Sequence, residues 1–322
     1  EVTYAAPYRQ LRADPVGVRP LVRAALARWP ADSVRQGLSM EAYVHFFQAA
    51  TAAAAVGALD DARRVLAVGA AGVPALRTPG SPRGIPVEEL ARRYDAGLQL
   101  ALGLPVTPAL ARQTAAAVRA TEGDADALGA ANREPYLASA VPLPYVAFLA
   151  TGDPAFRLTA ARWARGYHID SLPELDALEA LARGDSVRAR ALTRAFPSAD
   201  ATSDATRTIS YDGLRVAARA EVLARLGDAR GALRLYEGLD PARFQSWGHQ
   251  QLGWPLYVRS FLARGALYEA IGEPGRAAAA YARVLAIWRD ADPALAPQVA
   301  AARTGLARVR DAAGATRIPV AR

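Results

Sequence analysis

The stretch that decides the fold lies near the C-terminus and reads Phe261-Leu-Ala-Arg-Gly-Ala-Leu-Tyr-Glu-Ala-Ile-Gly-Glu-Pro-Gly-Arg-Ala-Ala-Ala-Ala-Tyr281. A glycine in its middle is followed by an acidic residue, and small residues and tyrosines stand on both sides. Because glycine adopts the left-handed conformation that closes a helix, the stretch predicts two antiparallel helices in close contact. Such a hairpin cannot bury its apolar face alone and must stack on neighbouring hairpins. The signature residues are Gly265, Tyr268, Gly272, Ala277 and Tyr281.

The same punctuation recurs earlier in the chain and indicates an internal repeat. A glycine followed by an acid ends an apolar-periodic stretch at Gly152, Gly184, Gly227 and Gly272. The acid favours the N-terminus of the next helix. We expect the small alanine of a recurring Gly-x4-Ala pattern to let the second helix of each hairpin approach the first. This pattern occurs at Gly57/Ala62, Gly184/Ala189, Gly227/Ala232 and Gly272/Ala277, and the unit before the last has the signature residues Gly227, Ala232 and Tyr236.

The repeat predicts an all-α fold, an α-solenoid of stacked antiparallel helical hairpins with short extended segments at both ends. We divide the chain into an extended N-terminal segment (1–16), degenerate hairpin repeats (17–197), clear repeats with a capping helix (198–312) and an extended tail (313–322). The stretch 123–141 is ambiguous, with a short helix near 127–131. The other helices are expected near 17–29, 40–56, 59–69, 87–102, 106–120, 143–151, 154–167, 173–183, 186–195, 210–226, 229–239, 256–271, 274–289 and 294–312.

Composition limits the classes of protein to consider. Of the 322 residues, 52% are apolar and 22% charged, which is typical of a globular chain and not of a disordered one. The net charge is +8, and every basic residue is arginine. Either a GC-rich genome or a surface for nucleic acid or another acidic polymer explains this charge. The chain has no cysteine, which excludes disulfides and zinc–thiolate sites, and no apolar run reaches the ~18 residues of a membrane span.

One insertion interrupts the two clearest repeats. Residues 241–255 carry four aromatic or histidine side chains in a Pro- and Gly-containing context. They either cover a gap in the helical stack or form a recognition loop, since exposed aromatic residues concentrate binding energy. The candidate partner-binding residues are Phe244, Trp247, His249 and Trp254.

The sequence displays no catalytic signature. It lacks the glycine-rich phosphate and dinucleotide loops, the nucleophile elbow and the His-Glu-x-x-His zinc motif, and without lysine it cannot form a Schiff base. The acidic pairs Asp60-Asp61 and Glu88-Glu89 fall in the first turns of predicted helices, where they offset the helix dipole. We expect no catalytic residue, no metal and no cofactor. The histidines, which we interpret as helix-end or core residues with metal binding as the alternative, are His45, His168 and His249.

From about Leu214 to Val309 the chain resembles the C-terminal tetratricopeptide repeat (TPR) region of bacterial signalling and regulatory proteins. The resemblance rests on Gly265-x-x-Tyr268, on Gly272-Glu, on Ala280-Tyr281 and on the Gly305-Leu306 helix, and it covers about a third of the chain. Two departures are Arg264 in place of leucine and the consensus proline delayed to Pro293. The resemblance implies docking platforms, sensing regions or assembly factors, and it does not choose among them.

These observations lead us to expect a non-enzymatic scaffold for protein–protein contacts. One version binds copies of itself through the solenoid ends and the strand-like termini, forming an oligomer, filament or tube. The other docks a peptide or partner, as a sensor region of a larger bacterial signalling protein. Less favoured are a superhelical enzyme acting on a polysaccharide and an arginine-rich nucleic-acid binder. Because the chain begins at Glu1 without methionine, we expect export after removal of a leader, with a cytoplasmic fragment as the alternative. The scarcity of Cys, Asn and Met is typical of a thermophile.

Overall fold

A computed structural model of the chain describes residues 5–33, 40–72, 75–76, 85–196, 212–239 and 252–315. Within these residues the fold is all-α, apart from two two-residue strands that pair antiparallel. The N-terminal half contains α1 (Ala5–Ala13), α2 (Val18–Ser33), α3 (Met40–Ala55), α4 (Leu59–Gly72), β1 (Ala75–Leu76), β2 (Ile85–Pro86), α5 (Val87–Ala101), α6 (Pro108–Ala127) and α7 (Ala130–Ala140). The C-terminal half contains α8 (Pro142–Thr151), α9 (Pro154–Ala164), α10 (Pro173–Ala182), α11 (Ser186–Thr193), α12 (Asp212–Arg225), α13 (Ala229–Glu237), α14 (Gly253–Ala270), α15 (Pro274–Ile287) and α16 (Ala296–Ala315). None of these helices is long and apolar enough to cross a lipid bilayer.

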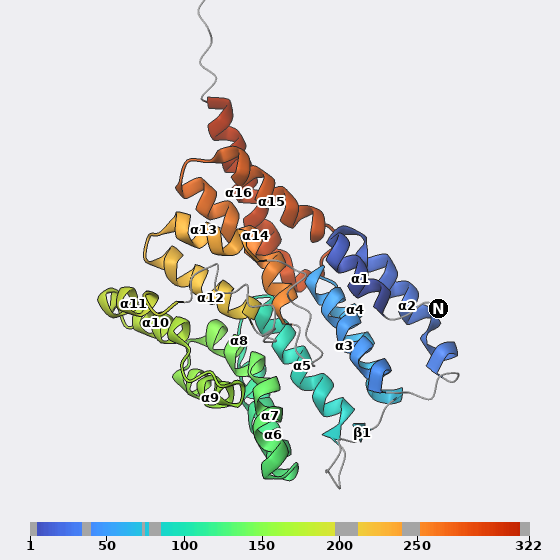
Figure 1. The fold of residues 1–322 in the computed structure, drawn as a ribbon. Helices are drawn as coiled ribbons and strands as arrows, with labels where there is room; N and C mark the ends of the chain where they lie inside the picture. Colours follow the sequence, from blue (N-terminus) through green and yellow to red (C-terminus); the bar gives the residue numbers. More distant parts are fainter. Residues whose placement is uncertain are drawn as a thin grey trace, which may run out of the picture.

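Consecutive helices form antiparallel hairpins, and the hairpins stack side by side (Figure 1). The pairs are α3–α4, α5–α6, α8–α9, α10–α11, α12–α13 and α14–α15, and α16 packs as the last helix against α14 and α15. First helices of the hairpins also contact one another: α3 with α5, α5 with α8, α12 with both α8 and α10, and α12 with α14. The expected solenoid of stacked hairpins is therefore confirmed.

Local backbone rules explain where the hairpins turn. Gly227 and Gly272 have φ angles of +86° and +76°, a region that favours glycine, and each ends the first helix of its hairpin. The Asp228 side chain then accepts a hydrogen bond from Gly231 N at 2.8 Å and caps the second helix. The alanine of each Gly-x4-Ala pattern has no exposed surface, which confirms its predicted place between the two helices: Ala62, Ala189, Ala232 and Ala277.

Helices α14, α15 and α16 meet at the ring of Tyr281. Gly265 on α14 lies so close to Tyr281 on α15 that a Cβ atom at Gly265 would stand 2.5 Å from Tyr281 Cε1. Gly305 on α16 lies against the same ring, where a Cβ atom would stand 2.4 Å from Cζ. Glycine at these two positions therefore lets three helices converge on a single buried tyrosine.

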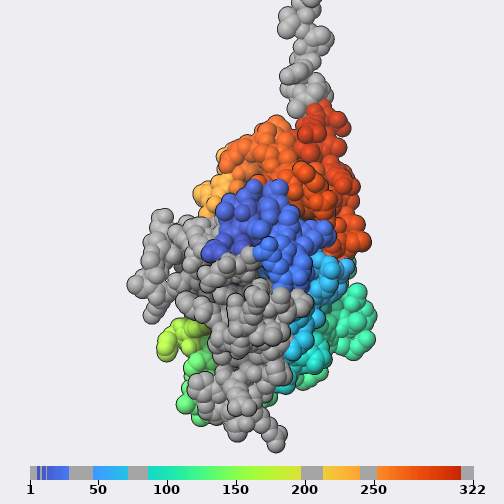
Figure 2. Space-filling view, turned by 90° about the vertical axis from the view of Figure 1, so that its right-hand side faces the viewer, coloured from blue at the N-terminus to red at the C-terminus, as the bar shows by residue number. Residues whose placement is uncertain are grey.

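The first and last parts of the chain also contact each other, which a simple open solenoid would not require. Helix α14 packs on α3 and α5, and Figure 2 shows the N-terminal helices lying against the C-terminal ones. Trp288 Nε1 donates to the Ala55 carbonyl at 3.0 Å, and Asp292 N donates to the Gly57 carbonyl at 2.8 Å. Arg19 on α2 pairs with the Asp292 carboxylate at 2.9 Å. The array is thus closed on itself, with the alanine-rich end of α3 in its centre.

Two expectations need correction. The N-terminal segment 1–16 was expected to be extended, but α1 is helical because Leu11 finds a buried place and α1 packs on α3. The ambiguous stretch 123–141 is almost wholly helical, since α6 continues to Ala127 and α7 begins at Ala130 after Gly129, whose φ is +76°. Residues 1–4, residues 197–211 and the tail from 316 lie outside the described residues.

Candidate functional site

Of the four predicted recognition residues, Trp254 alone lies within the described residues. Trp254 is fully buried near the start of α14, with its ring edge-on to Tyr257 at a centroid distance of 5.9 Å. Its selection as a partner-binding residue is therefore corrected: it belongs to the core, because the first turn of α14 lies in the middle of the closed array. Phe244, Trp247 and His249 lie outside the described residues.

The structure describes the side chains of one of the three histidines and of both acidic pairs. His168 ends a short helical turn with a φ of +58°, and its backbone N donates to the Arg165 carbonyl at 2.8 Å. The side chain of His45 and all of His249 lie outside the description. Asp60-Asp61 and Glu88-Glu89 lie in the first turns of α4 and α5, as predicted. Among the described residues, no group of three His, Cys, Asp or Glu side chains could hold a metal ion.

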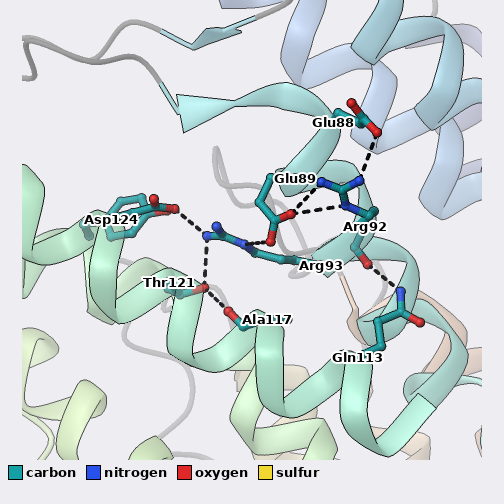
Figure 3. Close-up of polar contacts among 9 residues, drawn as sticks. Glu88, Glu89, Arg92, Arg93, Gln113, Ala117, Thr121 and Asp124 are labelled. Atoms are coloured by element: carbon teal, nitrogen blue, oxygen red, sulfur yellow. Dashed lines mark hydrogen bonds and ion pairs between the residues drawn. The ribbon is translucent and has the colours of Figure 1, made fainter. Parts of the chain in front are cut away.

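One polar network joins α5 to α6 (Figure 3). The Arg93 guanidinium lies between Glu89 at 3.2 Å and Asp124 at 2.5 Å, and also donates to Thr121 Oγ1 at 3.3 Å. Burial alone would raise the pKa of Glu89, but hydrogen bonds from Arg92 and Arg93 outweigh it and lower that pKa. An ionised carboxylate held in this way is not a proton donor near neutral pH.

A small pocket beside this network is lined by Phe47, Tyr94, Tyr136 and Leu252 together with Arg93. Its volume is about 40 Å³, enough for roughly one water molecule. Since its charged member, Arg93, is already bound to two carboxylates, we interpret this network as a structural joint between helices.

A second network is buried between α8, α10 and α12. Glu174 is fully buried and accepts hydrogen bonds from Arg215 Nε at 2.6 Å and from the Tyr145 hydroxyl at 3.2 Å. Arg219 Nε lies 3.7 Å from the same carboxylate, and its guanidinium stands over the Phe196 ring. Burial raises the pKa of Tyr145 well above its usual value, so its hydroxyl remains a donor. This network ties three hairpins together.

Exposed arginines without an ion pair within the described residues are concentrated around α12, whereas elsewhere they are more scattered, as Arg112 and Arg119 are on α6 and Arg303 and Arg310 on α16. Many described arginines outside this region form ion pairs, as Arg157 does with Asp176 at 2.6 Å. From residue 188 to residue 234, the arginines whose side chains are described are exposed and form no ion pair, apart from the two bound to Glu174. They lie on α11, α12 and α13, and we call them the α12 arginine surface: Arg188, Arg190, Arg194, Arg225, Arg230 and Arg234. The sequence could not reveal this surface, because spacing does not say which arginines meet an acid.

A hollow lies next to this surface, between α8, α10, α12, α13 and α14. Its volume is about 180 Å³, and its wall combines apolar side chains such as Phe148, Leu178 and Leu256 with an exposed polar surface of similar extent. The charged side chains Glu221, Arg225 and Arg259 also line it, and none of the three forms an ion pair within the described residues. We call it the α12 hollow. Its remaining lining residues are Leu149, Gly152, Ala182, Ala217, Ala218, Tyr236, Ser260 and Ala263.

Comparison of the chain with protein-family models, with curated proteins and with solved structures finds no match. The site is therefore interpreted from its own residues.

Proposed function

We propose that this protein is a non-enzymatic scaffold of the tetratricopeptide type, and that it docks an acidic polypeptide on the α12 arginine surface. The repeat assignment is supported by the packing of the signature residues, with Gly265 against Tyr281 and Ala277 buried between the helices. The observation that carries the docking proposal is the set of exposed arginines on α11 to α13 that form no ion pair.

An exposed arginine adds net positive charge to a surface mainly where no acidic side chain pairs with it. Exposed arginines that already have partners, such as Arg92 with Glu88 at 2.9 Å, offer little net charge to another molecule. Arg190 on α11 and Arg194, which caps the end of that helix, are four residues apart, and on α13 the same spacing separates Arg230 from Arg234. Both helices pack on α12, so positive charge gathers on its two flanks. Such a surface steers and holds a partner of opposite charge.

We favour docking over self-assembly through the solenoid ends. End-to-end assembly needs the first and last hairpins to present free surfaces to a neighbouring copy. Here contacts between the two ends, such as Arg19 with Asp292 and Arg283 with Asp14 at 3.1 Å, use part of those surfaces within one chain. We therefore expect sedimentation velocity to show a monomer at every concentration. A sedimentation coefficient that rises with protein concentration would favour self-assembly over docking.

Charge reversal tests the docking surface. The probe is a polyglutamate peptide of about 20 residues, with an oligonucleotide of equal charge as competitor. We expect the variant Arg190→Glu/Arg194→Glu to bind polyglutamate at least about tenfold more weakly than the natural chain. The matched control, Arg303→Glu/Arg310→Glu on α16, changes the net charge equally at two exposed arginines that form no ion pair. An equal loss of polyglutamate affinity in both variants would show that binding depends on net charge alone and would refute a localised surface.

The chain also allows the partner to be captured at one defined place. Since it has no cysteine, Arg190→Cys gives a single attachment point for a photo-crosslinker, and Arg303→Cys gives the control. We expect an acidic polypeptide to be captured from position 190 and not from 303, and to bind the purified chain when reconstituted. If the oligonucleotide instead displaces polyglutamate with a steep dependence on salt, nucleic-acid binding replaces the proposal.

A further inference from the structure

A tyrosine side chain whose hydroxyl makes no hydrogen bond within the described residues lines the α12 hollow. Tyr236 on α13 is 6% exposed and lines the hollow, and no described residue accepts a hydrogen bond from its hydroxyl. Burial raises the pKa of this hydroxyl, and the nearby Glu221 carboxylate raises it further, so the group is a neutral donor at physiological pH. The hydroxyl itself is not among the fully buried polar atoms, so it is open to the hollow and free to donate a hydrogen bond to a bound molecule.

The next repeat shows what this tyrosine lacks. The offset that separates Gly227 from Gly272 also separates Tyr236 from Tyr281. The Tyr281 hydroxyl donates to the Glu269 carboxylate, which in turn receives two hydrogen bonds from Arg308, at 2.6 and 2.8 Å. The repeat therefore supplies its last tyrosine with a carboxylate and a guanidinium.

In the earlier repeat both supporting side chains are cut short. At the same offset, Ala224 stands where the last repeat has Glu269, and Ala263 stands where it has Arg308. Ala224 and Ala263 pack in the same apolar cluster as Tyr236, and Ala263 lines the hollow. Neither alanine can supply the tyrosine hydroxyl with a carboxylate or a guanidinium, and the short Ala263 side chain is part of the wall of the hollow.

The charges on the rim suit an anion. Arg225 and Arg259 outnumber Glu221, and within the described part of the chain the Arg259 guanidinium makes only a long hydrogen bond, of 3.5 Å, to the Ala101 carbonyl. A guanidinium that is free of ion pairs can hold a carboxylate by charge-assisted hydrogen bonds. The hollow, of about 180 Å³, is large enough for one compact group, because a cavity of about 150 Å³ in another protein accommodates benzene.

We propose that the α12 hollow binds a small carboxylic acid with a compact apolar body, whose carboxylate accepts the Tyr236 hydrogen bond in the place that Glu269 fills for Tyr281. The apolar body lies against Leu178 and Leu256, where it displaces water. Arg259 at the rim balances the charge of the carboxylate. The two proposed sites share only Arg225, because the arginines of α11 and α13 do not line the hollow.

Isothermal titration calorimetry with phenylacetate as the probe tests the site. The full chain should bind phenylacetate with a Kd of roughly 1 mM or tighter, the range expected for so small a ligand. The neutral analogue phenylacetamide should bind at least about tenfold more weakly, because it cannot replace the carboxylate. Tyr236→Phe, which removes only the hydroxyl, should weaken phenylacetate binding by about tenfold. Ala224→Glu should abolish binding, since it places a carboxylate of the chain beside Tyr236, and Arg303→Ala on α16 is the control that should bind normally.

Three results would overturn the inference: equal binding of phenylacetate and phenylacetamide, unchanged binding by a folded Ala224→Glu variant, or no binding by the natural chain at about tenfold above the expected Kd. Circular dichroism establishes that each variant is folded. If Ala224→Glu does not fold, Tyr236→Phe decides, and unchanged affinity in that variant contradicts the proposed hydrogen bond. Loss of phenylacetate binding with normal capture of a polypeptide at position 190 would remove this site and leave the docking proposal standing.

Discussion

The packing around Tyr281 makes a sharp prediction for Gly265→Ala. The new Cβ atom would stand 2.5 Å from Tyr281 Cε1, well inside van der Waals contact. The ring cannot retreat cheaply, because Gly305 lies against it and its hydroxyl is bound to Glu269. Overpacking of a buried site costs about 1–3 kcal/mol, whereas alanine in a helix interior gains about 0.5–1 kcal/mol over glycine. We therefore expect a net loss of about 1–2 kcal/mol in the free energy of unfolding.

The control for this prediction is Gly123→Ala on α6. Gly123 is exposed within its helix, and a Cβ atom there would meet nothing within 4 Å. Only the helix-propensity gain remains, so this variant should be more stable by about 0.5–1 kcal/mol. Urea unfolding followed by far-ultraviolet circular dichroism measures both variants, with the midpoint compared at equal slope. If Gly265→Ala gains stability as Gly123→Ala does, the argument that glycine is needed for helix convergence is wrong.

Three further perturbations have expected outcomes. Trp254→Ala should lower the free energy of unfolding by about 3–5 kcal/mol in urea titration, because the ring is fully buried in the core. Glu174→Ala should cost a similar amount, about 3–5 kcal/mol in the same assay, since it removes the fully buried carboxylate that pairs with Arg215 and Arg219. The pKa of Glu89 is lowered in the folded state, so its contribution to stability is present above the unfolded value of 4.5 and is lost as the pH falls through the folded value. Stability of the natural chain should therefore fall more steeply below pH 4.5 than that of Glu89→Gln, and parallel curves would argue against the Arg93 joint.

Most helix boundaries could be predicted from the sequence, because they depend on local rules. Glycines with positive φ end helices, and acids such as Asp228 begin the next ones, whatever the rest of the chain does. The α1 helix was missed because its short apolar face is stabilised mainly by contact with α3. The long α7 was missed because Pro135 within it reads as a breaker.

The candidate site was much less predictable. The aromatic residue Trp254 was selected as exposed, yet it lies in the core because the first turn of α14 reaches the middle of the array. The α12 arginine surface and the hollow at Tyr236 were not anticipated. The hollow has a sequence signal that could have found it, namely Ala224 and Ala263 at the repeat positions where Glu269 and Arg308 stand later.

By itself, the sequence determined the helical hairpins, their turns and the small residues between their helices, since each of these follows from interactions within a few turns of chain. Only the tertiary structure decided that Trp288 reaches Ala55 and closes the array, that Arg93 is held by two acids, and that the arginines of α11 and α13 meet none. The physical reason is that an ion pair or a buried ring depends on which distant helices come into contact, and a repeat pattern is the same whether or not its ends meet.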